Sequence, residues 1–350
     1  MNSGVSLAAR GRNFTRSVLL RAGGCGLDVD SIRQTALTRW GPVGAEDIAK
    51  AAVSALGTSD TGNQSPAAVE FFDLIRAQSI YGRLTGLRKI PFRVRMIRMT
   101  GGSRGYWVGQ AKPIPVSKAA LLNTAGIEPA QVAAITVVTD EAVRFGGVAE
   151  STFEGDLRRA VAASWDEAFL DRTNAGESTS IEVIRPAAVT YGAPSVAGTG
   201  DPVADIAALI EGFTGDLGAA FFVTDPKTAA QLGLYRNGSG LVFPDVGPRG
   251  GTIVGIQVLT SSSSPRDSDG GQIALIDPTG IAGGDGGIDV DRSDVAALQM
   301  SDTPEEGPTE LVSLFQCNLV ALKSVVFVNW RVERPGSVSV LTNADYPPAS

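Results

Sequence analysis

The spacing of apolar residues predicts a long amphipathic helix over residues 151–171. Ser151 and Glu154 form a capping box, in which each side chain accepts a hydrogen bond from a backbone donor of the first turn. Apolar side chains recur at every fourth position, whereas charged residues, Asp166 among them, fall mostly on the other faces. The apolar stripe consists of Phe153, Leu157, Val161, Trp165 and Phe169. At about 1.5 Å per residue the helix is roughly 30 Å long, which suits a spine for neighbouring sheets.

Two apolar runs predict long strands on either side of this helix in the sequence. Residues 131–139 are almost continuously apolar and predict a buried strand. Residues 319–332 predict a second strand, and after a turn at 335–336 residues 337–341 predict another. These strands and the helix indicate one α+β region built from distant parts of the chain.

A second α+β region is predicted from residue 201 onward. Asp201 and Pro202 give a helix start, because an aspartate caps the first turn and proline fits its first position. The helical positions expected to face inward are Val203, Ile206, Ile210 and Phe213. Strands are expected at 219–224, 252–260 and 272–277.

The amino-terminal residues predict an arm followed by a helix. Residues 1–65 carry short apolar clusters separated by Gly and Ser, which indicates an arm with one short helix at 44–56. Ser65 and Pro66 begin a second helix that ends near Gly82. Its inward positions are Val69, Phe72 and Ile75.

A basic hairpin is predicted after this helix. Residues 92–99 alternate apolar and basic side chains, and 106–109 supply a second strand beyond a turn at 101–102. Arginines line one face and little apolar surface lies on the other, so we expect a partner to steady the hairpin.

Composition removes several classes of function. The 350 residues include no histidine, so the usual neutral-pH acid/base, the serine triad and the commonest metal ligand are missing. Cys25 and Cys317 are too few for a disulfide framework, which favours a reducing compartment. No run of eighteen apolar residues and no signal peptide is present, so we expect a soluble protein with no membrane partner and no cofactor.

Charge is segregated along the chain, although the formal net charge is only -7. Residues 74–127 contain many Lys and Arg and no acid, whereas residues 267–310 contain many acids and one arginine, Arg292. The first 27 residues carry basic side chains and no acid, which fits phosphate contact, a transit peptide or a solvated arm docked on a neighbouring subunit. These basic side chains are Arg10, Arg12, Arg16 and Arg21.

Three motifs suggest chemistry that their surroundings do not support. Residues 101–105 match the G-x-S-x-G nucleophile elbow, but they lie at a hairpin turn in a chain without histidine. The Gly/Asp-rich run at 283–291 departs from both calcium-binding patterns, so an acidic surface loop is expected. Asp140 and Glu141 form a carboxylate pair at a strand end, where starting a helix explains them.

The order of these elements resembles the major capsid proteins of tailed bacteriophages. The resemblance is carried by VGQAKPIPVSKA at 108–119, VAAITVVTDEAVR at 132–144, SWDEAFLDR at 164–172 and VNWRVERPGSVSVLT at 328–342. It spans residues 66–342, with an Arg-Pro step at Arg334-Pro335 near its end.

The resemblance implies an α+β tailed-phage major capsid fold with six consecutive segments. These are an arm at 1–65, joined by the helix at 66–89 to an E-loop hairpin at 90–130; a peripheral domain at 131–200 with the spine helix; an axial domain at 201–300; and return strands at 301–350. Copies would form pentamers and hexamers, with the basic hairpin of one lying on the acidic region of the next. The predicted inter-subunit contacts are Arg93, Arg95, Arg98, Arg104, Lys112, Asp285, Asp289 and Asp291.

Some members of this family cross-link a hairpin lysine to a neighbour's asparagine with the help of a buried glutamate. Lys112 and Asn318 are the counterparts here, but Val325 holds the place of the assisting acid. We therefore expect no self-cross-linking.

The leading hypothesis from the sequence is a non-enzymatic shell protein of a virion, assembled in the host bacterial cytoplasm around double-stranded DNA. The basic arm would contact DNA without sequence preference, and a portal and possibly scaffold or decoration proteins would be further partners. The alternatives are an encapsulin-type compartment with the same fold and, more remotely, a carboxylate-dependent enzyme that uses Asp140 and Glu141.

Overall fold

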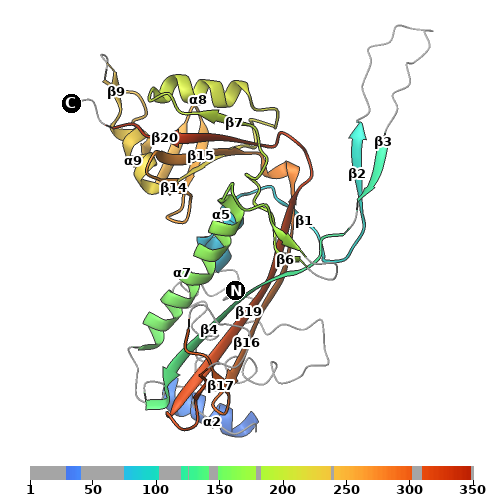
Figure 1. The fold of residues 1–350 in the computed structure, drawn as a ribbon, viewed down its shortest axis with the longest axis vertical. Helices are drawn as coiled ribbons and strands as arrows, with labels where there is room; N and C mark the ends of the chain where they lie inside the picture. Colours follow the sequence, from blue (N-terminus) through green and yellow to red (C-terminus); the bar gives the residue numbers. More distant parts are fainter. Residues whose placement is uncertain are drawn as a thin grey trace, which may run out of the picture.

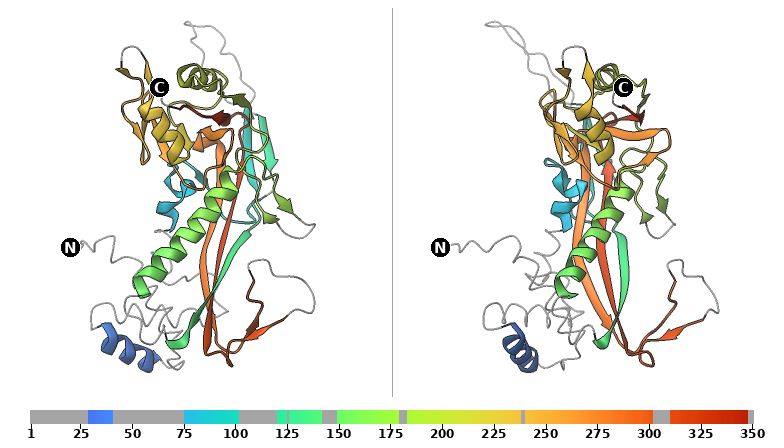
Figure 2. Two further views of the ribbon diagram at one scale, coloured as in Figure 1. Left: turned by 60° about the vertical axis from the view of Figure 1, so that its left-hand side comes forward. Right: turned by 90° about the vertical axis from the view of Figure 1, so that its left-hand side faces the viewer.

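The structure is a computed structural model that describes residues 29–40, 75–101, 120–124, 126–141, 149–178, 183–237, 240–301 and 310–347. These residues form an elongated sheet flanked by a long helix, a compact unit at one end of that sheet, and a two-stranded ribbon that projects from it (Figure 1, Figure 2). No helix among them is long and apolar enough to span a membrane.

The elongated sheet has four strands in the order β1-β16-β19-β4. Its two central strands are β16, Ile281–Ser293, and β19, Leu319–Val332, which are antiparallel with Ile281 opposite Val332. β4, Ala130–Thr139, pairs with β19 on one side, and the short β1, Arg88–Lys89, runs parallel to β16 on the other. The predicted strands at 131–139 and 319–332 are confirmed.

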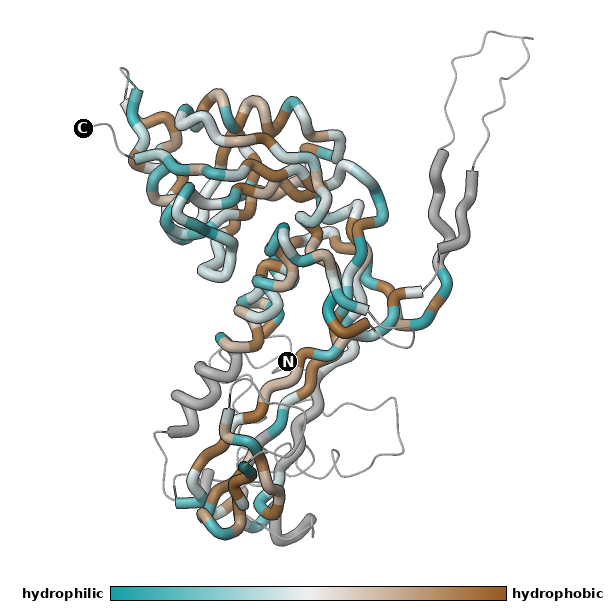
Figure 3. Tube along the Cα trace, in the orientation of Figure 1, coloured by the Kyte–Doolittle hydropathy of each residue, from teal (hydrophilic) through white to brown (hydrophobic). Residues whose placement is uncertain are grey.

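β4 is less buried than its composition predicted. It is an edge strand, and its side chains alternate between exposed and half-buried along most of its length, with Ile135 55% exposed. The apolar run reflects a strand with one face against the core and one edge unpaired by the described residues, rather than a strand enclosed on both sides. Figure 3 shows hydrophobic stretches along these long strands.

The spine helix is confirmed as α7, Ala149–Leu170. It begins two residues before Ser151, so the predicted capping position lies within the first turn. Val161, Trp165 and Phe169 are buried as predicted. Asp166, expected on a polar face, is only 3% exposed, because it faces the segment at Ile80 and the loop after residue 260.

The compact unit is built on an eight-stranded sheet, with seven strands in the order β11-β12-β13-β8-β15-β20-β7 and β14 paired to β15. Its strands are β7 Ser195–Ala197, β8 Phe221–Thr224, β11 Val246–Gly247, β12 Gly250–Ile253, β13 Ile256–Thr260, β14 Arg266–Asp267, β15 Gly270–Ile276 and β20 Val338–Ala344. The tail strand β20 therefore returns into this sheet beside β15, far from it in sequence.

Two helices cover one face of the compact sheet. α8, Pro202–Glu211, begins at the Asp201 cap as predicted, since the Asp201 side chain accepts from the Val203 amide. Ile206 and Phe213 are buried, but Val203 is 47% exposed, which corrects its predicted inward position. The second helix, α9, Pro226–Leu234, has the same Asp-Pro start at Asp225 and was not predicted.

The remaining elements are short. They are α2 Val29–Trp40, α5 Ile80–Arg83, β2 Met96–Gly101, β3 Ala120–Thr124, β5 Glu177–Ser178, β6 Val183–Arg185, β9 Arg236–Asn237, β10 Gly240–Leu241, η1 Pro278–Gly280, β17 Ala297–Leu298 and β18 Val312–Ser313. The predicted helix at 66–81 corresponds to a helical turn at 75–78 and then α5, and its start lies outside the described residues, as does the predicted helix at 44–56.

The Gly/Asp-rich run at 283–291 is a strand, not the acidic loop expected from its sequence. It forms most of β16 and pairs with β19, with a register shift between Asp285 and Ile288. Its glycines leave space for aromatic rings, because a Cβ at Gly283 would collide with the Tyr81 side chain and one at Gly284 with the Phe92 ring. Packing therefore explains the glycines better than a calcium loop does.

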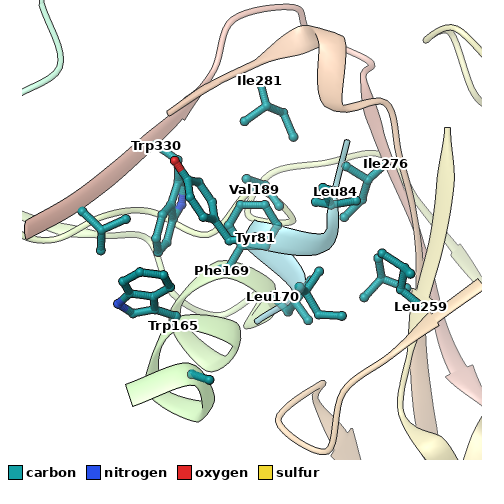
Figure 4. Close-up of a cluster of buried hydrophobic side chains, with 14 of the residues drawn as sticks. Tyr81, Leu84, Trp165, Phe169, Leu170, Val189, Leu259, Ile276, Ile281 and Trp330 are labelled. Atoms are coloured by element: carbon teal, nitrogen blue, oxygen red, sulfur yellow. The ribbon is translucent and has the colours of Figure 1, made fainter. Parts of the chain in front are cut away.

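An aromatic cluster joins α5, α7 and β19. The Phe169 and Trp330 rings meet edge to face with centroids 5.1 Å apart, and the Tyr81 ring lies 6.0 Å from the rings of Trp165, Phe169 and Trp330 (Figure 4). The same core continues into the compact sheet through Phe221 and Ile276. A second core fills the opposite face of that sheet beneath α8 and α9.

Candidate assembly surfaces

The projecting ribbon consists of β2 and β3, which pair antiparallel from Met96 opposite Thr124 to Gly101 opposite Ala120 (Figure 1). The prediction had the wrong second strand: Met99 lies opposite Leu121, not opposite residues 106–109, which are outside the described residues. The G-x-S-x-G match at 101–105 likewise begins in a strand, because Gly101 is paired. An isolated two-stranded ribbon is marginally stable in water, so the base that joins it to the body is what fixes its position within this chain.

The base of the ribbon is fixed to the body by backbone and apolar contacts. The Arg93 amide donates to the Ile127 carbonyl at 2.9 Å, which joins the two legs of the ribbon. The Ile90 amide donates to the Gly283 carbonyl of β16 at 2.9 Å, which joins one leg to the body. Phe92, Ile127 and Ala282 form a small apolar cluster beneath it. The ribbon therefore leaves the body from an ordered base rather than from a loose linker.

Two of the predicted inter-subunit residues have ion-pair partners in their own chain. Asp285 Oδ2 lies 3.3 Å from Lys89 Nζ and 3.6 Å from Arg76 Nη1, and Arg93 pairs with Glu128. The Arg93–Glu128 pair is largely exposed, so it can exchange partners at small cost. Asp289 and Asp291 lie in β16 opposite Val325 and Lys323.

The structure places the other predicted residues on the ribbon or outside the described ranges. Arg95 is exposed before β2, and Arg98 lies in β2 opposite Leu122. Their inter-subunit role stays a prediction. Outside the described residues are Arg104, Lys112, Arg10, Arg12, Arg16 and Arg21. Val325 is buried and Asn318 directly precedes β19, so the expected absence of cross-linking also stays a prediction.

A polar cluster at Asp277 joins the compact unit to the elongated sheet. Asp277 is fully buried, and its carboxylate accepts from the Thr279 amide and hydroxyl, from the Asp216 amide at 2.9 Å and from Arg334 Nη1 at 3.0 Å. The Gly280 carbonyl accepts from the amides of residues 333 and 334. The two chain segments that pass between the units, from β15 to β16 and from β19 to β20, are thus held together. Arg334 of the predicted Arg-Pro step supplies the positive charge.

The spine helix is tied to both units by one buried carboxylate. Asp166 accepts from the Ile80 amide and from the Ser261 hydroxyl, each at 2.6 Å. Burial raises the pKa of Asp166 to about 6, although both hydrogen bonds and the nearby Arg83 lower it. Sequence periodicity could not reveal this role, because Asp166 sits next to the buried Trp165 at the border of the stripe.

Apolar side chains are exposed at the far end of the elongated sheet, where residues 293–319 connect β16 to β19. Four large ones in this segment are more than half exposed: Val295, Met300, Leu311 and Phe315. The sequence predicted an acidic region over residues 267–310, and these exposed apolar side chains were not predicted. Surface apolar groups gathered in one segment are typical of a protein that binds another chain.

Comparison with known proteins identifies the family of this chain. A model of the phage capsid family matches residues 72–343. A curated relative, the capsid polyprotein of Pseudomonas phage PAJU2, is 34% identical over 324 residues, which is 85% of this chain and 48% of the relative. This chain thus spans about half the length of that relative.

Solved structures show the same fold at low sequence identity. A chain from Mycobacterium phage Adephagia gives a TM-score of 0.52 at 16% identity, covering 77% of this chain and 89% of its own. One from Microbacterium phage Oxtober96 gives 0.52 at 18% identity, covering 74% and 90%. The predicted α+β capsid fold is confirmed, and neither an encapsulin nor a carboxylate-dependent enzyme is favoured. Because the family model covers most of the sequence, the chain belongs to the phage capsid family.

Proposed function

We propose that this chain is a major capsid protein whose copies assemble as pentamers and hexamers into an icosahedral shell around phage double-stranded DNA. The observation that carries the proposal is the projecting β2–β3 ribbon, which extends from the body in a member of the phage capsid family. The shell is a structural part of the virion, assembled in the cytoplasm of the host bacterium.

In this proposal the ribbon is the E-loop, within residues 90–130. The other segments are an arm at 1–65, the connecting helix at 66–89, a peripheral domain at 131–200, an axial domain at 201–300 and return strands at 301–350. Sheet membership departs from these limits at two places. β16 begins in the axial range but belongs to the elongated sheet, and β20 in the return range belongs to the compact sheet.

Charge supports docking of the ribbon on a neighbouring copy. Arg93 and Arg95 are exposed at its base, and acidic residues such as Asp289 lie on the long strand β16. Each exposed ion pair contributes under about 1 kcal/mol, but repetition over a closed shell makes the sum large. Complementary charge also fixes the register between copies.

Contacts with DNA rest on the basic arm. Its arginines neutralise phosphate without reading sequence, so binding weakens steeply with salt. A portal completes the particle, and scaffold or decoration proteins are further partners of the same shell.

The test replaces Arg93, Arg95 and Arg98 together by Glu. The expected result is a folded subunit by circular dichroism that forms no shells by electron microscopy, because the ribbon repels the acidic neighbour. A control with the same charge change, Arg172, Arg236 and Arg249 to Glu, alters exposed arginines away from the ribbon and should assemble normally. Normal shells from the ribbon variant would overturn the docking proposal.

A further inference from the structure

One outer strand of the two large sheets differs from the other three. The compact sheet ends in β11, two residues long, and β7, three residues long. The elongated sheet ends on one side in β1, whose two residues are Arg88 and Lys89. Short or charged outer strands are the usual protection against pairing with another chain.

The opposite edge of the elongated sheet carries no such protection. β4 is ten residues long, AQVAAITVVT, with no charge, no proline and no glycine. It pairs with β19 on one side, and β6 lies beside its amino-terminal part without pairing, so the central stretch 133–137 has no strand partner on its outer side among the described residues. Alternate residues there direct amide and carbonyl groups outward.

We propose that β4 of one copy pairs antiparallel with β4 of a second copy, about a two-fold axis at Ile135. The two four-stranded sheets then form one continuous sheet across the contact. Ile135, 55% exposed in the single chain, then lies beside its own counterpart on the same face of the sheet and loses part of that exposure.

The pleat of a strand restricts this register. Residues directly opposite each other in antiparallel strands point to the same face of the sheet. Self-pairing therefore joins odd positions with odd and even with even, and the axis falls on a residue rather than between two. Centring on Ile135 places Ala133 opposite Val137 and Ala134 opposite Thr136, so small residues face β-branched ones and no charge is buried.

The lack of charge on β4 favours the same strand of a second copy as occupant. A two-fold contact brings each side chain near its own copy, so any charge close to the axis would meet a like charge. A strand that binds the basic ribbon would bind it more tightly if it carried acidic side chains, and β4 carries none. Capsid subunits also meet many copies of themselves, so this partner is always at hand.

This contact is separate from the docking of the ribbon. The ribbon joins neighbours head to tail around a ring, whereas a two-fold contact joins subunits across rings. The arginine variants of the ribbon leave β4 unchanged, so failure of one proposal does not decide the other.

The experiment uses Ile135→Lys and Ile135→Glu in the full chain, expressed separately and together. Each alone should lower particle yield, since like charges meet at a contact repeated over the shell; Ile135→Lys, which also faces Lys323 of β19 in its own chain, should lower it at least about tenfold, and Ile135→Glu, which Lys323 partly offsets, should lower it less. Co-expression should restore particles that hold both variants in equal amounts, because Lys then faces Glu. Ile135→Thr, neutral and β-branched, is the control and should stay within about twofold of the parent yield.

Two results would overturn the proposal. Normal particles from Ile135→Lys alone would show that the edge is not covered in the shell. Loss in both charged variants without rescue on mixing would show that β4 faces a different element, such as a neighbour's ribbon.

A second measurement does not depend on tolerance of a charge. Ile135→Cys, in a chain with Cys25 and Cys317 changed to Ser, should give disulfide-linked dimers through the introduced thiol on oxidation of assembled particles. Particles that form normally but yield only monomer on a non-reducing gel would contradict pairing at Ile135.

Discussion

The two large sheets of this protein differ in how far their outer strands and faces are covered by the chain itself. The compact sheet has a packed core on each face and outer strands of two and three residues, so its hydrogen bonding is nearly complete within the chain. The elongated sheet has one long uncharged edge, and its far end exposes Val295 and Phe315. Exposed apolar side chains occur in both units, Val254 and Leu234 in the compact one among them, so the long uncharged edge strand β4 is what distinguishes the elongated sheet.

Two buried carboxylates of the compact unit have several partners each. In the compact unit Asp205 accepts from the Thr199 amide and hydroxyl and from the Tyr346 hydroxyl. Burial, together with Asp205, raises the pKa of Tyr346. Asp225 caps α9 and pairs with Arg266. The chain end is thereby closed onto the compact unit, and such satisfied networks rigidify a fold.

The largest expected effect comes from breaking the core that links the two regions. Phe169→Ala should cost about 3–5 kcal/mol of unfolding free energy, because a fully buried ring between Tyr81 and Trp330 is replaced by a cavity. Urea denaturation of the unassembled chain measures it. Val203→Ala, at a half-exposed helix position, should change stability by less than about 0.5 kcal/mol. A loss below about 1 kcal/mol in Phe169→Ala would mean that this cluster does not couple the regions.

A smaller effect is expected from the carboxylate that ties α7 to both regions, and it depends on pH. Its folded-state pKa of about 6 exceeds the ordinary value of 3.8, so the native state holds the proton more tightly. The stability from this group is present below pH 3.8 and is lost as pH rises through 6. Asp166→Asn should therefore gain up to about 3 kcal/mol relative to the parent between pH 4 and pH 7.

Paired denaturation curves of parent and variant at several pH values check this. The difference in unfolding free energy, rather than either curve alone, isolates Asp166 from other titrating groups. A difference that is flat across the interval, or that moves the opposite way, would contradict the assigned environment.

The smallest effect is expected at the exposed base of the ribbon. Glu128→Gln removes the partner of Arg93 but keeps the main-chain carbonyl that accepts from Asn329 Nδ2. Because both side chains are more than half exposed, stability should change by less than about 1 kcal/mol, and 1 M salt should remove the difference. Thermal melts at low and high salt measure it; a larger, salt-independent loss would show that the base is a structural joint.

Local sequence patterns predicted many elements of this fold. The fourth-residue stripe identified α7, the Asp-Pro start identified α8, and β-branched runs identified β4 and β19, because these signals depend on residues close in sequence. The same Asp-Pro start at Asp225 was overlooked for α9. The ribbon was recognised from alternating Arg and apolar residues, but its second strand was misplaced because pairing partners are not encoded locally.

The sequence by itself determined α7, α8, β4 and β19, the segregation of charge and, through the order of elements, the capsid fold. Tertiary structure alone decided that a Gly/Asp-rich run is a central strand, that Asp166 is buried, and that β4 lies at an edge. These outcomes depend on what each residue meets across long stretches of chain. Tyr81 makes Gly283 necessary, Ser261 holds Asp166, and Ile135 lies on the more exposed face of β4.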